Sequence, residues 1–343
     1  MLASGSTSES LKMMPVYSAR RRRFLGAGAF ASLASFLGPL QARAEPAFPS
    51  RTIRVVVPFT PGGGTDVVGR TLIVGMQSVL GQSLVIDNKP GAGTVIGTDI
   101  VAKAPPDGYT LLLTTSAVAI NDSLVKKLPY STRNDLTEVG LICSGPNVLV
   151  VRPDSPLKTV ADVIAAAKAA PGKLSYASSG NGSAVHLAGE LFKTTAGVDI
   201  IHVPYRGAGP AYTDLIGGQV NMLFGTAGGV AKLVDGGKMR AIGVTSTRRS
   251  PVYKDIPAIA ETLPGYEADV WYAMFAPAGT PPAVIAKINA ALRKAAETAA
   301  YKERLAHEGL AVAVNTPEEM TRFMRAEEAR WRKVVVEGKV TID

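Results

Sequence analysis

The chain has 343 residues, of which 46% are hydrophobic and 19% charged, and its formal net charge is +9. This length is sufficient for two lobes that each bury a core. Residues 1–44 hold six basic residues against one acidic residue, so five of the nine excess positive charges lie there and four in the remainder. This small surplus fits the capture of anions, and no basic stripe with interleaved aromatics indicates a nucleic-acid partner.

The N-terminal segment has the pattern of an export signal. Arg21, Arg22 and Arg23 precede an apolar run from Phe24 to Leu40, and Ala42-Arg43-Ala44 supplies small residues for a signal peptidase. The twin arginines followed by one residue and Phe24-Leu25 resemble a twin-arginine signal, although an ordinary export signal with a basic start is the alternative. We therefore expect a twin-arginine export signal over residues 1–44 and a cleaved, periplasmic protein.

In the first part of the mature chain, strand-like and helix-like segments alternate. The apolar patterns predict a strand over 53–58, a helix over 66–80 that Gly81 closes, and strands over 84–86 and 110–113. The longest apolar stretch of this part covers residues 141–151.

A second alternating set follows. Thr159 and Asp162 predict a capped helix to about residue 170, and Pro281-Pro282 opens an alanine-rich helix to about residue 300. Thr316 to Glu319 forms a capping box for a last helix to about residue 336. The remaining predicted elements are a helix over 183–195 and strands over 174–177, 200–203, 220–224 and 241–245.

This alternation predicts an α/β fold with mostly parallel sheets flanked by helices on both faces. We expect residues 45–150 to begin lobe 1, residues 151–270 to form lobe 2, and residues 271–343 to return to lobe 1 with the C-terminal helices. The crossings between lobes are predicted near 150–154 and 269–276.

A glycine-rich turn joins the first strand to its helix. Phe59, Thr60 and Pro61 lead into Gly62 to Asp66, and the unpaired N–H groups of a helix start stabilise an anion. Capping of the helix by Thr65 or Asp66 would compete for the same donors. The turn lacks the lysine of a phosphate loop and the spaced glycines of a dinucleotide site, so no nucleotide cofactor is expected.

A second turn, Tyr176 to Ser183, has the corresponding place in the second set, and Ser183 is a candidate cap for its helix. Two such turns facing each other across a cleft would clamp a carboxylate, and lobe closure would complete the site. The serines do not form the Gly-x-Ser-x-Gly elbow of a hydrolase, so catalysis is not favoured. A metal is not expected either, because Cys143 is the only cysteine and the three histidines are scattered.

Three further features have a functional and a structural interpretation. Tyr205 is a candidate donor to a carboxylate, and Arg206 is either an anion partner or a solvated surface residue. We interpret His186 as a hydrogen-bonded structural residue, and Trp271-Tyr272 as packing between the lobes.

Several ordered motifs together resemble the Bug family, the substrate-binding proteins of tripartite tricarboxylate transporters. The motifs cover nearly all of residues 48–343 and are Pro49 to Phe59, Pro61 to Asp66, Asn88 to Gly93, Pro106 to Leu111, Val203 to Gly207 and Phe275 to Pro281. The resemblance implies a two-lobed periplasmic binding protein fold of type II-like architecture, with a carboxylate in the interlobe cleft.

The resemblance also implies ligand contacts, partners and the absence of catalysis or a cofactor. It implies delivery of the ligand to the membrane permease subunits of the transporter, and a monomer is expected. The ligand contacts carried over to this sequence are Phe59, Pro61, Gly62, Gly63, Thr65 and Asp66 in the first lobe and Ser179, Asn181, Gly182 and Ser183 in the second, with Tyr205 nearby and Thr115 and Ser116 as wall residues.

Asn221 and Gly225 stand where family members often carry carboxylates. An ammonium group would need such an acceptor, so the sequence favours a mono- or dicarboxylate, aromatic ones included, over an amino acid. The alternatives are a binding protein that docks on a membrane sensor kinase, and an exported hydrolase that uses Ser179 or Ser183.

Overall fold

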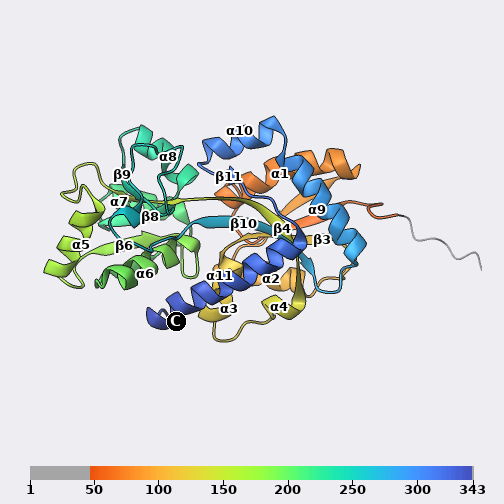
Figure 1. Cartoon of the computed structure of the whole chain (residues 1–343), viewed down its shortest axis with the longest axis horizontal. Coiled ribbons are helices and arrows are strands. Elements are labelled where there is room, and N and C mark those ends of the chain that lie inside the picture. Colours follow the sequence, from red (N-terminus) through yellow and green to blue (C-terminus); the bar gives the residue numbers. More distant parts are fainter. Residues whose placement is uncertain (1–46, 342–343) are drawn as a thin grey trace, which may run out of the picture. The chain divides into compact units, whose positions relative to one another are not determined.

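The computed structural model describes residues 47–341 (Figure 1). The expected export signal lies outside the described residues. Two sheets flanked by helices make up the fold, as the sequence predicted, but both sheets are mixed, and antiparallel pairs of strands outnumber the parallel pairs that were expected to predominate. We call the first sheet and its helices the first lobe, and the second sheet and its helices the second lobe.

The first sheet has six strands in the order β11-β4-β10-β3-β1-β2. Their bounds are β1 (Ile53–Val57), β2 (Leu84–Asn88), β3 (Thr110–Thr115), β4 (Leu136–Gly145), β10 (Val270–Pro277) and β11 (Ala311–Val312). The second sheet has five strands in the order β7-β6-β8-β5-β9. Their bounds are β5 (Asn147–Val151), β6 (Ser175–Ser178), β7 (Ile201–Pro204), β8 (Met222–Thr226) and β9 (Arg240–Val244).

The helices pack on the faces of these sheets. Their bounds are α1 (Gly64–Leu80), α2 (Val95–Ala102), α3 (Ala117–Leu124), α4 (Thr132–Asp135), α5 (Val160–Ala169), α6 (Ala184–Ala196), α7 (Ala208–Ile216), α8 (Ala227–Asp235), α9 (Pro282–Ala296), α10 (Ala299–His307) and α11 (Pro317–Glu337). In the described part of the chain, no helix combines the length and hydropathy needed to span a membrane.

The two sheets repeat the same arrangement. In each, the first strand of a βαβ unit lies between its two parallel neighbours, as β1 does between β2 and β3 and β6 between β7 and β8. An antiparallel strand, β10 or β5, then follows the third strand. The turns before α1 and α6 therefore have equivalent positions, at carboxyl ends of strands where α/β proteins bind ligands.

The long apolar stretch predicted over 141–151 is two strands that belong to different sheets. β4 ends at Gly145 and β5 begins at Asn147, with Pro146 between them. Proline lacks the N–H needed to continue a ladder, so the chain leaves the first sheet there. The first crossing therefore lies earlier than the expected 150–154, whereas β10 starts at Val270, within the second expected range (Figure 1).

The chain after β10 returns to the first lobe. α9 packs against α1, where a Cβ added to Gly75 would lie only 2.7 Å from that of Ala295. The expected single helix to residue 300 ends at Ala296, and Thr298 then caps a separate helix, α10. The capping box at Thr316 opens α11 as expected, and α11 packs on α3 and β4.

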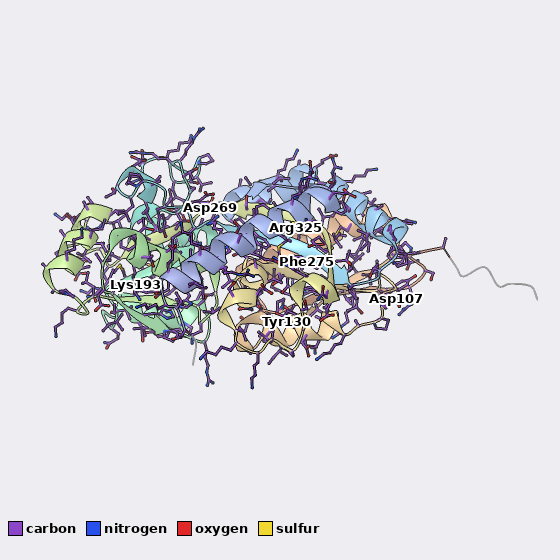
Figure 2. All side chains as sticks on the ribbon, turned by 60° about the horizontal axis from the view of Figure 1, so that its bottom comes forward. Asp107, Tyr130, Lys193, Asp269, Phe275 and Arg325 are labelled. Carbon is purple, nitrogen blue, oxygen red and sulfur yellow. The ribbon has the colours of Figure 1, made fainter. Side chains whose placement is uncertain are left out.

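Buried polar contacts tie the two crossings together. Asn147 donates from its side chain to the carbonyl of Ala268 (2.8 Å) and from its backbone to Thr245 Oγ1 (2.7 Å). Thr245 in turn donates to Asp269, labelled in Figure 2 (3.1 Å). Burial raises the pKa of Asp269 from 3.8 to about 6. The hydrogen bond from Thr245 opposes this rise, and the charge of Glu267 adds to it.

A buried carboxylate fixes α11 to the start of β10. Glu327 Oε2 accepts from the indole nitrogens of Trp271 (2.7 Å) and Trp331 (2.9 Å), and Glu327 Oε1 accepts from Arg330 (2.9 Å). Trp271 also belongs to a buried cluster with residues of both sheets, such as Leu112 and Phe224, which agrees with the packing between the lobes that the sequence analysis expected.

We predict that Asp269→Asn stabilises the protein at pH 7.5 and has no effect near pH 4. The raised pKa means that Asp269 favours the folded state below about pH 3.8, and that this contribution is lost as the pH rises through about 6. Asparagine imitates the protonated acid and still accepts from Thr245. Chemical unfolding at both pH values measures the difference, with exposed Asp255→Asn as the control; destabilisation by Asp269→Asn at pH 7.5 would contradict the prediction.

Candidate functional site

The start of α1 offers backbone donors without partners. The N-cap residue Gly63 has extended backbone angles (φ −73°, ψ 165°) and no side chain caps the helix. Within residues 47–341, the N–H groups of Gly64, Thr65 and Asp66 have no hydrogen-bond acceptor. The competing possibility, that Thr65 or Asp66 caps this helix, is therefore not what the structure contains.

Asp66 instead holds the glycine turn in shape. Its side chain is buried and accepts from Gly62 N (2.9 Å), Arg70 Nε (2.9 Å) and Asn88 Nδ2 (3.0 Å). Asn88 also donates to the carbonyl of Phe59 (3.0 Å). Burial alone would raise the pKa of Asp66, but the hydrogen bonds from Arg70, Gly62 and Asn88 outweigh it and lower that pKa. The carboxylate thus stays ionised and organises the turn.

A tyrosine hydroxyl lies beside these free donors. A Cβ added to Gly64 would lie 3.5 Å from Tyr272 Oη, and this hydroxyl has no hydrogen-bond partner among the described residues. Burial, followed by the charges of Cys143, Glu308 and Tyr212, raises the pKa of Tyr272, so it remains a neutral donor. The sequence analysis expected Tyr272 only to pack between the lobes and did not predict that its hydroxyl lies beside the start of α1.

The equivalent turn before α6 is largely satisfied by its own residues. Ser183 Oγ accepts from His186 N (3.3 Å), which is the cap that the sequence suggested, and donates to the carbonyl of Gly180 (2.6 Å). Gly180 N donates to Ser178 Oγ (3.1 Å), and Gly182 N donates to His186 Nδ1 (3.2 Å). The two turns are therefore unequal, because α1 is uncapped and α6 is capped.

Two stacked histidines, His186 and His202, make hydrogen bonds to this second turn. The rings of His186 and His202 lie 4.0 Å apart, and His202 Nε2 lies 2.7 Å from Ser178 Oγ. Burial and then the charge of Lys193 lower the pKa of His186 to about 4, and burial and then His186 lower that of His202 to about 3. Both rings are neutral at pH 7, which agrees with the structural role expected for His186.

The serine–histidine contact does not resemble a nucleophilic site. Ser178 is only 1% exposed, so a substrate has no direct access to its hydroxyl. Ser183, which the hydrolase alternative would use, has its hydroxyl engaged as the cap of α6. These contacts give each hydroxyl a part in shaping the turn.

A small pocket of about 30 Å³ adjoins the second turn. Its walls come from the second turn, α6, α7 and β8, and consist of Ser179, Val185, Ala208, Ala211, Tyr212, Leu223, Phe224, Gly225 and Thr226. Of these, only Ser179 was among the residues predicted from the sequence. No charged side chain is part of this wall.

Three other predicted residues have their polar groups engaged or buried. Tyr205 donates its hydroxyl to Asp214 (2.6 Å), so its proton is already used in the fold. Thr115 is 6% exposed and accepts weakly from Ala117 N (3.4 Å). Ser116 is fully buried, and its backbone N–H donates to the carbonyl of Trp271 (3.1 Å). Their contact with a ligand stays a prediction.

The two lobes meet beside the turns. A Cβ added to Gly93 would lie 3.0 Å from the carbonyl oxygen of Asn181, and one added to Gly182 would lie 3.0 Å from Asn121 Oδ1. Asn121 is buried and donates to the carbonyl of Gly93 (2.7 Å) and to Thr94 Oγ1 (3.1 Å). The glycines of the Asn88–Gly93 motif were the only feature of the sequence that could have indicated this contact. No sequence pattern singled out Asn121.

Two like sheets joined by two crossings, with glycine-containing turns at equivalent strand ends, are typical of bilobed solute-binding proteins. The profile of the Tripartite tricarboxylate transporter family receptor matches residues 68–339. Protein BugT of Bordetella pertussis is 38% identical over 313 residues, which are 90% of this chain and 95% of BugT. The chain therefore belongs to the tripartite tricarboxylate transporter receptor family, which confirms the resemblance to the Bug proteins.

Solved structures support the same assignment. R. palustris Rpa4515 with adipate is 35% identical with a TM-score of 0.81, over 86% of this chain and 99% of that one. MatC from Rhodopseudomonas palustris with bound malate is 33% identical with a TM-score of 0.77, over 84% and 100% of the two chains. The periplasmic binding protein BugD is 33% identical with a TM-score of 0.79, over 86% and 99%. The predicted fold class is confirmed.

We predict that Asp66→Asn loosens the glycine turn. The amide has no charge for Arg70 and one acceptor oxygen fewer, and hydrogen bonds to charged groups contribute about 1.5–3 kcal/mol. The free energy of unfolding should fall by roughly this amount, and the amide proton of Gly62 should exchange faster with solvent. Asp87→Asn, which also removes a carboxylate paired to an arginine, Arg54, is the control. If Gly62 exchanges equally fast in both variants, Asp66 does not hold the turn.

Proposed function

We propose that this chain is a periplasmic solute-binding protein that captures a small carboxylate between its lobes and delivers it to the membrane permease of a tripartite tricarboxylate transporter. The observation that carries the proposal is the uncapped start of α1, where the N–H groups of Gly64, Thr65 and Asp66 lack acceptors next to the hydroxyl of Tyr272. The relatives with adipate and malate support the same ligand class.

Physical chemistry favours an anion at this position. The first N–H groups of a helix carry partial positive charge, and a carboxylate there satisfies donors that otherwise lack a partner. The neighbouring cation Arg70 already pairs with Asp66, so the donors proposed for the ligand are neutral. A ligand held this way is bound through directed hydrogen bonds, which suits reversible capture and release.

The proposed contacts combine the residues expected from the sequence with two additional ones. In the first lobe they are Phe59, Pro61, Gly62, Gly63, Thr65, Asp66, Thr115 and Ser116, joined by Gly64 and Tyr272. In the second lobe they are Ser179, Asn181, Gly182, Ser183 and Tyr205. Movement of the lobes about the two crossings would bring the sets together around the ligand.

We also propose that the protein acts as a monomer without catalysis and reaches the periplasm through the signal in residues 1–44. For the lobes, we keep the boundaries predicted from the sequence, except that the first crossing lies at Pro146. Delivery to a permease is proposed over sensing because the matched family is a transporter receptor.

We predict that Gly64→Pro weakens carboxylate binding by roughly 10–100-fold. Proline is favoured at the first position of a helix and Gly63 has the extended backbone that precedes proline, so the variant removes one donor and keeps the helix. The expected loss corresponds to one hydrogen bond to a charged group. Thermal-shift screening of carboxylates, amino acids and sugars identifies the probe, and titration calorimetry measures its affinity.

Gly64→Ala is the matched control for this experiment. It adds a Cβ that meets only Tyr272 Oη at an ordinary contact distance, and it keeps the N–H group. Equal affinity of both variants for the carboxylate would remove this N–H from the site. Stabilisation of the wild-type protein by sugars or amino acids alone would overturn the proposed ligand class.

For export, we predict that replacing Arg21 and Arg22 by lysine leaves the precursor in the cytoplasm. The twin-arginine pathway reads the arginine pair itself, whereas an ordinary export signal needs only positive charge. Cell fractionation with immunoblotting measures the mature form. Unchanged periplasmic yield would show that the ordinary signal is the correct interpretation.

A further inference from the structure

Strained backbone is concentrated in the segment that follows β2. Four consecutive residues, Gly91 to Thr94, have positive φ angles, which range from 45° at Ala92 to 136° at Gly91. Ala92 and Thr94 are two of the three non-glycine residues with positive φ in residues 47–341. A left-handed conformation is costly for a β-branched residue such as Thr94, so other contacts must hold this segment in place.

Asn121 provides those contacts from α3. Its side-chain nitrogen donates to the carbonyl of Gly93 (2.7 Å) and to Thr94 Oγ1 (3.1 Å), so it bonds to the strained residues directly. Asn121 is 1% exposed, and its Oδ1 is buried without a hydrogen-bond partner in the described part of the chain. A buried amide oxygen without a partner costs free energy, so this atom needs an explanation beyond the fixing of the segment.

This arrangement meets the second turn at two points. A Cβ added to Gly93 would lie 3.0 Å from the carbonyl oxygen of Asn181. One added to the buried Gly182 would lie 3.0 Å from Asn121 Oδ1 and 3.6 Å from Leu124 Cδ2. Each approach requires a glycine on one side. Asn181 and Gly182 are among the proposed ligand contacts, so the first lobe touches the proposed binding surface of the second lobe directly.

We propose that Asn121 is a positioning residue for ligand capture, because it holds the first lobe against the second turn at Gly93 and Gly182. We call Asn121 and the segment Gly91–Thr94 the interlobe latch. The inference rests on the proposed function for its ligand, whereas the contact between the lobes is independent of it. A ligand that needs both lobes gains affinity from every contact that favours their closed arrangement.

The strained conformation suits this role. Asn121 fixes the segment within the first lobe, so its residues need not be ordered at the moment when the lobes meet, and less free energy is lost on closure. If Asn121 served the first lobe alone, its replacement would lower stability without changing how the lobes meet. The distance between the lobes therefore separates the two roles.

Distances between two spin labels measure this effect without a ligand. Exposed Val74 on α1 and Ile216 at the end of α7 are replaced by labelled cysteines, and the native Cys143 is buried and stays unlabelled. We expect Asn121→Ala to shift and broaden the distance distribution. Asn289→Ala is the matched control and should not, because this buried asparagine also donates to two carbonyls (2.8 and 2.9 Å), but both belong to the first lobe.

The same variants are titrated with adipate and with malate by calorimetry. We expect Asn121→Ala to weaken the binding of either acid by roughly 5–100-fold, the usual range for coupling between two sites, and Asn289→Ala to leave it unchanged. An unchanged distance distribution, or an unchanged affinity, in Asn121→Ala would overturn the proposal. If the parent protein binds neither acid, the distances alone decide on the latch, and the failure concerns the proposed ligand instead.

A second pair of variants separates crowding between the lobes from backbone strain. Gly93→Ala places a Cβ against the carbonyl of Asn181, which must then move by a few tenths of an ångström. Gly197, the C-cap of α6, has nearly the same conformation (φ 61°, ψ 46°, against 60° and 38° at Gly93), but no atom lies within 4 Å of its Cβ position. Gly197→Ala therefore reports the strain alone.

Both alanine variants should lose similar stability, measured as the fall in their thermal midpoints. We expect only Gly93→Ala to shift the distance distribution and to weaken the binding of the acids. If Gly93→Ala and Gly197→Ala have the same distance distribution, the segment does not hold the lobes together and the proposal is wrong.

Discussion

The uncapped start of α1 is the constraint on which the rest of the site depends. A helix must satisfy its first N–H groups, and here the protein's described residues leave three of them without an acceptor. Keeping those donors available requires that the preceding turn be fixed by other means. Asp66 accepts hydrogen bonds from Gly62 N and from the side chain of Asn88. These bonds hold the glycine turn in place without capping the start of α1.

The second lobe satisfies the backbone groups at the start of its helix in a different way. Its turn has the equivalent place in a sheet of the same order, yet Ser183, Ser178 and His186 satisfy much of its backbone internally. Such a turn is a preformed surface, whereas the first turn supplies strong donors. In the proposed function, the first lobe therefore holds the charged group of the ligand, and the second lobe contributes a surface whose own hydrogen bonds are already made.

Much of this arrangement could be predicted from residues with a local effect. Glycine runs after apolar strands located both turns, and the pairs Thr159–Asp162 and Thr316–Glu319 correctly predicted helix starts. Hydrophobicity alone could not separate β4 from β5, because both are buried on both faces and only Pro146 marks the change of sheet. The role of Tyr272 and the walls of the pocket depend on contacts between residues far apart in sequence, for which no local pattern exists.

A binding site made of backbone N–H groups also affects how the protein can change over generations. Substitutions cannot remove these donors, except for proline, because every other residue supplies the same N–H group. The pocket wall differs, since each of its side chains is encoded separately and can be replaced without touching the anchor. In the proposed site, mutation of the surrounding side chains can therefore alter which carboxylate is accepted while the backbone donors persist.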